Sequence, residues 1–301
     1  MLMYETALTK EKPGDQAMGL RRMKQPRPVK AIAVTGGKGG VGKTNVAVNL
    51  SLALAGMGNE VMLLDADFGL ANVDVQLGLS PEYDLSHLVS GERNLEEIII
   101  RGPGGIKIIP ASSGISRMAD LTQAERAGII HAFSELSWDV DYLVVDTSAG
   151  ISDSVISFCK ASHEVVVVVC DEPASITDAY ALIKVMNREH GVDHFHVLAN
   201  MVYSNRQGTE LYNKLALAAN HFLDATLSFL GIVPQDERLR QAVQKQKAVV
   251  ALYPSSPSSG AFRKIAGNVE KWPDVRNAGG QLEFFVERLV NNESEAGGLE
   301  P

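Results

Sequence analysis

Short apolar segments alternate with amphipathic helical segments over most of the chain. The predicted strands cover residues 29–35, 60–66, 106–109, 142–146, 165–170, 195–201 and a short stretch that ends at Val233. The predicted helices cover 43–57, 121–136, 152–160, 175–189 and 209–227, and the pattern from there to about 292 is helical. Such alternation is typical of a parallel sheet covered by helices on both faces. The pattern therefore predicts an α/β fold, a three-layer, doubly wound, mostly parallel sheet.

The two ends of the chain differ from this body. Residues 1–28 contain three prolines and no strong apolar periodicity, which predicts a flexible arm with one short helix capped by Asp15. The body should span 29–275, and 276–301 should form a C-terminal helix and a polar tail. One face of that helix is apolar and consists of Leu282, Phe285, Val286, Leu289 and Val290.

The polar face of the C-terminal helix is acidic, with Glu283 and Glu287 against the single Arg288. Membrane-surface helices usually have basic polar faces. Packing of this helix on the body is therefore the favoured hypothesis, and reversible membrane contact remains the alternative.

Charge and composition limit the class of protein. The net charge is −8, although residues 1–30 carry seven basic and three acidic side chains, so the body is strongly acidic. An acidic body binds nucleic acid poorly, because binding depends on neutralising phosphates. No apolar run approaches the roughly 18 residues of a membrane span. The two cysteines, Cys159 and Cys170, lie in helix and strand contexts as expected of reduced core thiols, so we expect a cytoplasmic protein without direct nucleic-acid binding.

The most specific motif is a glycine-rich loop between the first predicted strand and helix. It reads Gly37-Lys38-Gly39-Gly40-Val41-Gly42-Lys43-Thr44 and matches G-x-x-x-x-G-K-[ST]. Glycines let the backbone amides turn inward around phosphate oxygens, and the following helix adds the positive end of its dipole. Lys43 should reach the β- and γ-phosphates, and the Thr44 hydroxyl should bind Mg²⁺. The loop predicts binding of ATP with Mg²⁺.

Carboxylates follow two further strands. Asp65 and Asp67 end the strand at 60–66, and Asp146 ends the strand at 142–146. Parallel sheets place their ligand chemistry at the carboxyl ends of strands. These acids should therefore lie beside the phosphate loop.

The loop, with its second lysine, and the order of the carboxylate segments resemble the deviant Walker A ATPases of the MinD/ParA family, which are P-loop NTPases of the SIMIBI class. The resemblance implies that Lys38 crosses an ATP-dependent homodimer and acts on the partner's nucleotide, as an arginine finger does. It also implies that Asp67 orients the attacking water and that Asp146 holds a Mg²⁺-bound water. Asp65 would assist Mg²⁺ or the switch region.

The same resemblance implies a base-binding site. Asn200 would read the adenine, and Pro234 and Asp236 belong to a loop that flanks the base. The loop and Asn45 next to it would contact the nucleotide. The chain departs from its relatives at two positions: Asn45 replaces a second threonine of the loop, and Ser152 replaces an acidic residue of MinD. The dimer contact made by that acidic residue is therefore not carried over to this chain.

Within the family, residues 67–74 and 170–180 look most like the flagellar number regulators FlhG/FleN. The segment Asp15-Gln16-Ala17-Met18-Gly19-Leu20-Arg21 resembles the FlhG helix that activates an SRP-type flagellar GTPase (FlhF-like). Gln16 would then help orient the water in that GTPase. The implied function is an ATP-hydrolysing switch that limits flagellar number through this GTPase and an AAA+ transcriptional activator (FleQ-like). Its implied location is the cytoplasm, with the inner membrane or cell pole as a peripheral site.

Other functions stay open at this point. A MinD/ParA-type cell-division or partition ATPase is disfavoured by the acidic body, the acidic C-terminal helix and the arm. An electron-transfer reductase would need paired cluster cysteines, which the contexts of Cys159 and Cys170 do not suggest. A nucleotide-dependent adaptor with negligible turnover would have the same motifs, so the motifs do not distinguish it from an active ATPase.

Overall fold

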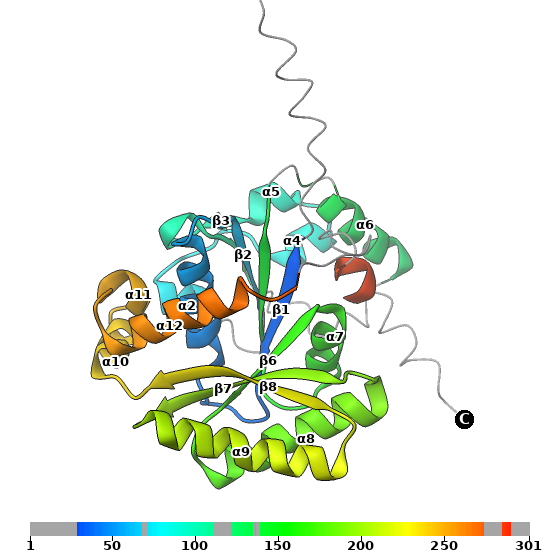
Figure 1. The fold of residues 1–301 in the computed structure, drawn as a ribbon. Coiled ribbons are helices and arrows are strands. Elements are labelled where there is room, and N and C mark those ends of the chain that lie inside the picture. Colours follow the sequence, from blue (N-terminus) through cyan, green and yellow to red (C-terminus); the bar gives the residue numbers. More distant parts are fainter. Residues whose placement is uncertain are drawn as a thin grey trace, which may run out of the picture.

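The computed structural model describes residues 29–67, 72–110, 122–134, 136, 139–273 and 285–289. The strands in this part form one eight-stranded sheet in the order β3-β4-β2-β5-β1-β6-β7-β8 (Figure 1). The short edge strand β3 runs antiparallel to β4, and every other neighbouring pair is parallel. The doubly wound, mostly parallel α/β fold predicted from the sequence is confirmed.

The elements follow one another in the predicted alternation. The strands are β1 (Lys30–Thr35), β2 (Val61–Ala66), β3 (Ile100–Arg101), β4 (Lys107–Ile109), β5 (Tyr142–Thr147), β6 (Glu164–Val169), β7 (His194–Val202) and β8 (Thr226–Pro234). The longer helices are α2 (Lys43–Ala55), α6 (Gln123–Ser134), α7 (Asp153–Ala161), α8 (Pro173–His190), α9 (Asn205–Phe222), α10 (Glu237–Gln244) and α12 (Pro257–Val269). The short ones are α3 (Val73–Leu77), α4 (Leu85–Val89), α5 (Leu95–Ile98), α11 (Val249–Leu252) and the 3₁₀ turn Pro103–Gly105.

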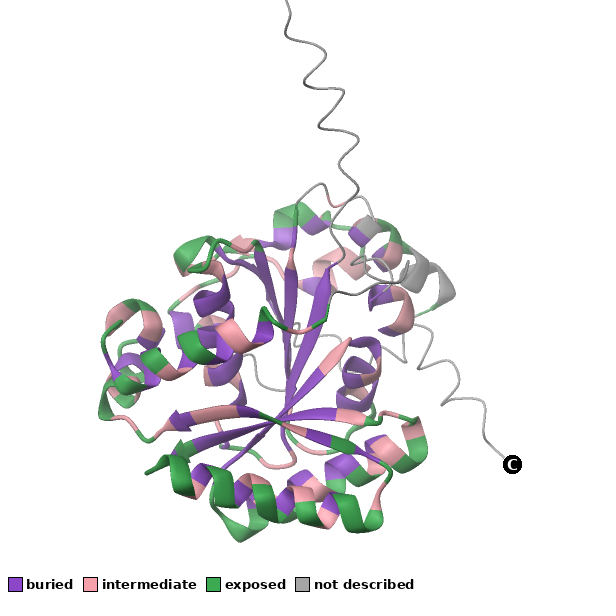
Figure 2. Ribbon diagram, viewed as in Figure 1, coloured by how far each residue is buried: buried purple, intermediate pink, exposed green. Residues whose placement is uncertain are grey.

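Both faces of the sheet are buried, which explains the continuous apolar runs. In β1, Ile32 and Val34 pack with α2 and α12 on one face, whereas Ala31 and Ala33 face the cores under α6, α7 and α8. Figure 2 shows the central strands almost entirely buried and the helices exposed on their outer sides, whereas the edge strand β8 is largely intermediate or exposed. The three layers place the carboxyl ends of β1, β2 and β5 next to one another, since β5 lies between the other two.

The structure corrects several element boundaries. The helix predicted to run to Leu227 ends at Phe222, because Leu223 is extended and Thr226 already pairs with His194 of β7. The short helices α3, α4 and α5 and the strand β3 have no counterpart in the prediction. Side-chain caps begin two of them: Asp84 accepts from the Ser86 amide at α4, and Asn94 accepts from the Glu97 amide at α5.

The described part of the C-terminal segment, residues 285–289, packs on the body of the protein. Residues 285–289 are helical, and Phe285, Val286 and Leu289 are each 2% exposed. The Phe285 ring stacks on Phe158 of α7 at 6.5 Å between centroids. This placement supports intramolecular packing of the apolar face and hides it from a membrane in this conformation. Among the described helices, none is both long enough and apolar enough to cross a bilayer.

Replacing Phe285 by alanine should lower the free energy of unfolding by about 3 kcal/mol, because the change leaves a cavity in the core beneath α6 and α7. Phe222→Ala, at a phenylalanine that is 59% exposed, is the matched control and should change stability by less than about 0.5 kcal/mol. Urea unfolding of both variants measures the difference. Equal stability of the two variants would show that the C-terminal segment does not pack as described.

Candidate functional site

The phosphate loop depends on glycine at positions where the backbone is left-handed or crowded. Gly40 and Gly42 have φ of 81° and 91°, a region that other residues rarely adopt. A Cβ on Gly37 would lie 2.2 Å from the carbonyl of Asp178 in α8. The loop is therefore pressed against the first half of α8, and its curvature brings backbone amides together at the start of α2.

Lys43 begins α2 and is buried beneath the loop. Its side chain is 8% exposed, and Nζ lies 3.4 Å from the carbonyl oxygen of Lys38. Burial lowers the pKa of Lys43, whereas the nearby Asp146 and Asp67 raise it. The ammonium is thus held inside the loop, facing the carboxyl ends of β2 and β5, where phosphate oxygens would bind.

Asp146 is the most unusual group in the site. It is fully buried at the end of β5, and neither carboxylate oxygen has a hydrogen-bond partner among the described residues. Burial raises the pKa of Asp146 to about 8, although Thr44 and Lys43 counteract this effect. The Thr44 hydroxyl is close enough to favour the charged form without making a hydrogen bond of ordinary geometry. An orphaned carboxylate beside a threonine hydroxyl fits Mg²⁺, a hard cation that prefers oxygen ligands.

Asp65 lies directly opposite Asp146 on the neighbouring strand but has a different environment. Its two oxygens accept the backbone amides of Asp67, Asn72 and Val73, each at 3.1 Å. Burial raises the pKa of Asp65 to about 6, and these hydrogen bonds oppose the rise. Of the two roles considered for Asp65, these contacts favour positioning the Asp67 amide and the start of α3 over binding Mg²⁺.

Asp67 stands at the mouth of the same cluster. It is half-buried, and its Oδ2 accepts a long hydrogen bond, 3.4 Å, from Nδ2 of Asn72. A weakly held carboxylate at a phosphate site can hold and orient a water molecule. Gly150, after β5, donates its amide to the carbonyl of Gly36 at 3.1 Å, which ties the following loop to the phosphate loop.

The side chain of Lys38 pairs with Glu172, just before α8. Nζ lies 2.7 Å from Oε2, and the side chains are 38% and 59% exposed. The hydrogen bond to Glu172 raises the pKa of Lys38, so the lysine is charged. Sequence reasoning did not find Glu172, because the pair spans 134 residues and no local pattern marks it.

The base-binding residues predicted from the resemblance are split between two environments. Asn200 is 4% exposed and donates from Nδ2 to the carbonyl of Val41 at 2.8 Å, so it contacts the phosphate loop. Next to it, Met201 has φ of 56° and the pairing of β7 with β8 shifts register, a bulge that can re-aim a side chain.

Pro234 lines an open groove of about 560 Å³ between β8, the β7–α9 loop and α12. Asp236 instead caps α10 through the Arg238 amide and accepts the amide and hydroxyl of Ser258 at 3.0 and 2.6 Å. Asn45, expected at the nucleotide, accepts a hydrogen bond from Gln76 of α3. Gln16 lies outside the described residues. The adenine, Asn45 and Gln16 assignments therefore stay predictions.

The two cysteines are core residues. Cys159 packs in the core under α7 and α8, and burial raises the pKa of its thiol to about 12. The thiolate is the form that binds metal. Cys170 is also buried, at the end of β6, so neither thiol is placed as a cluster ligand.

Comparisons with known proteins identify the family of the chain. Residues 28–270 match the ParA family model, described as NUBPL iron-transfer P-loop NTPase. The antiactivator FleN of Pseudomonas aeruginosa is 55% identical over 273 residues, which cover 91% of this chain and 98% of FleN. The flagellum site-determining protein YlxH of Helicobacter pylori is 36% identical and covers 79% of this chain and 81% of its own length.

The fold has solved counterparts. The septum site-determining protein MinD of Pyrococcus horikoshii, solved with Mg-ADP, superposes with a TM-score of 0.63 at 22% identity. The match covers 81% of this chain and 96% of that structure, and at this identity it speaks for the fold alone. The chain belongs to the ParA family of P-loop NTPases, is of the MinD/ParA type, and resembles FlhG/FleN in particular.

Proposed function

We propose that this chain is an ATP-hydrolysing switch that dimerises with ATP and restrains flagellar biosynthesis through a transcriptional activator. The observation that carries the flagellar part is the 55% identity to an antiactivator over nearly the whole of both chains. The observation that carries the ATPase part is the cluster of Lys43, Thr44 and Asp146 around a glycine loop.

The residues of the site have distinct roles in this proposal. The loop amides and Lys43 bind the β- and γ-phosphates, and the start of α2 adds its dipole. Thr44 and Asp146 would hold Mg²⁺, which supplies charge neutralisation at the phosphates. Asp67 accepts a hydrogen bond from the attacking water and orients it toward the γ-phosphorus. Asp65 holds the Asp67 amide and the start of α3 in place through its three amide contacts.

Lys38 links hydrolysis to dimerisation. In the monomer it pairs with Glu172 near the surface. Exposed ion pairs are weak, so the ammonium can leave Glu172 for a polyphosphate on a second subunit. There it would neutralise the charge that develops as the γ-phosphate departs. Glu172 thus holds the lysine in a resting position until a partner brings ATP.

The proposal includes two partner proteins. The first is the SRP-type GTPase, in which Gln16 of the arm would orient the attacking water, and the second is the AAA+ activator, which the ATP-bound dimer would bind. Peripheral contact with the inner membrane or pole would require the 285–289 segment to leave the core first. Phe285, Val286 and Leu289 are the apolar residues that this release would expose.

Light scattering with ATP and with ADP should separate the roles of two residues. Asp67→Ala should be a dimer with ATP, because it binds ATP without turning it over, whereas Lys38→Ala should remain monomeric. Lys214→Ala, at an exposed lysine of α9, is the matched control and should behave as the unaltered chain does. Dimerisation of Lys38→Ala equal to that of the control would rule out the trans role of Lys38.

Transcription in a P. aeruginosa strain without FleN should test the flagellar role. Expression of this chain should lower flagellar gene transcription toward the parental level, whereas Lys43→Ala, which loses the phosphate contact, should not. Lys214→Ala should act as the unaltered chain does. If the chain accumulates to the level of native FleN and transcription is unchanged, the antiactivator function is wrong while the ATPase proposal stands.

A further inference from the structure

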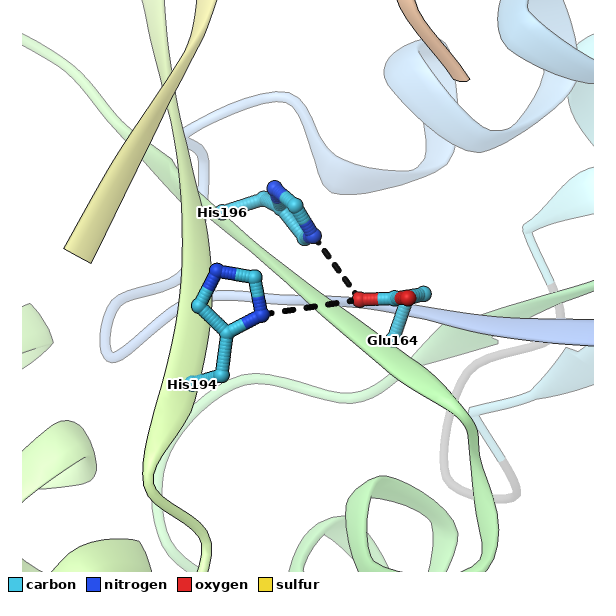
Figure 3. Close-up of side chains that lie close together, drawn as sticks. All are labelled: Glu164, His194 and His196. Atoms are coloured by element: carbon cyan, nitrogen blue, oxygen red, sulfur yellow. Dashed lines mark hydrogen bonds and ion pairs between the residues drawn. The ribbon is translucent and has the colours of Figure 1, made fainter. Parts of the chain in front are cut away.

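A second cluster of chemically active side chains lies at the opposite end of the sheet from the phosphate loop. Glu164 is the first residue of β6, and His194 and His196 lie two residues apart near the start of the adjacent strand β7. Residues i and i+2 of a strand share a face, so both imidazoles project toward Glu164 (Figure 3). The length of β6, about 16 Å at 3.3 Å per residue, separates this cluster from the nucleotide site.

The three side chains present converging ligand atoms. Nε2 of His196 lies 2.8 Å and Nδ1 of His194 lies 3.8 Å from the same oxygen, Oε2 of Glu164 (Figure 3). All three ligand atoms lie within 4.8 Å of one another. Zinc–ligand bonds of roughly 2.0–2.1 Å in a tetrahedron place neighbouring ligand atoms about 3.4 Å apart. The observed spacings lie on either side of that value, so small side-chain rotations would bring the atoms to it.

The surroundings orient both rings. Nε2 of His194 lies 2.9 Å from the Ser228 hydroxyl on β8. When Nε2 donates its proton to Ser228, the lone pair of Nδ1 faces Glu164. The ring of His196 stacks on Trp272 at 4.0 Å between centroids and an angle of 22°. Metal-binding histidines usually donate the N–H of their second ring nitrogen to a hydrogen-bond partner, which fixes the tautomer and the orientation of the ring.

The charge and access of the cluster also suit a cation. Glu164 is 18% and His196 6% exposed, whereas His194 is 42% exposed and leaves an entry path. The nearby Lys30 donates a hydrogen bond to the backbone carbonyl of Trp272 at 3.0 Å.

We propose that Glu164, His194 and His196 form a binding site for a divalent transition-metal ion of the zinc type. Two imidazoles and one carboxylate would bind the ion, with water in the fourth position. In the metal-free form Nε2 of His196 contacts Glu164 at 2.8 Å. The ion would bind the neutral ring through Nε2 with the single ring proton on Nδ1, and any proton held between Nε2 and Glu164 would be released to solvent. The bound ion would cross-link β6 to β7 and stabilise the end of the sheet at which α12 and Trp272 pack.

Titration calorimetry with Zn²⁺, on the full chain stripped of metal and free of nucleotide, tests the proposal. We expect one ion per chain, with at least about a 10-fold loss of affinity in His194→Asn and in Glu164→Gln. His221→Asn, at an exposed histidine of α9, is the matched control and should bind as the unaltered chain does. His194 is partly exposed and Glu164→Gln keeps the side-chain shape, so both variants should fold and bind MgADP normally.

A second readout is the visible absorption of bound Co²⁺, which is intense when the ion is tetrahedral. This band should appear in the unaltered chain and in His221→Asn, and should be absent from His194→Asn. Equal Zn²⁺ affinity in all of these proteins would overturn the proposal, because the ion would then bind elsewhere. Displacement of Zn²⁺ by MgADP would overturn it as well, since it would place the ion at the phosphate loop.

Discussion

The nucleotide site is organised around a buried carboxylate that nothing in the described part of the chain satisfies. Asp146 ends the central strand β5 with both oxygens unpartnered, while Lys43 and Thr44 begin the helix beside it. Burying a charged group without partners is costly, and a protein retains such a group where a ligand completes it. The parallel sheet creates the position, because β5 lies between the strands that end in the glycine loop and in Asp65.

The sequence predicts the site well where its chemistry is local. The glycine spacing, Lys43 and Thr44 lie within eight consecutive residues, and strand ends at Asp65 and Asp146 follow from apolar runs alone. The roles of these two acids are less predictable, because they look alike in the sequence and differ in their hydrogen bonds. Asp65 accepts hydrogen bonds from three backbone amides, whereas neither oxygen of Asp146 accepts one from the described residues. The Lys38–Glu172 pair could not be read from the sequence, since it joins segments far apart in the chain.

The contrast between local and long-range information also explains where the predicted elements differ from the structure. The boundary between α9 and β8 was missed because no glycine or proline marks it, and pairing with β7 decides it. The helices α4 and α5 have only five and four residues, too few to show a period, and their caps become evident only with their amide partners in place. The His-x-His pattern on β7 was visible in the sequence, but its partner Glu164 is supplied by the register of β6.

The central claim is that Lys38 of one subunit completes the site that holds the other subunit's Asp67. ATP hydrolysis by a mixture of Lys38→Ala and Asp67→Ala chains tests it directly, with each variant alone as the reference. The account predicts that each variant is inactive and that mixing restores turnover, because one site of the mixed dimer contains an intact Asp67 and receives an intact Lys38. A mixture as inactive as its components, under conditions in which mixed dimers form, would contradict the account.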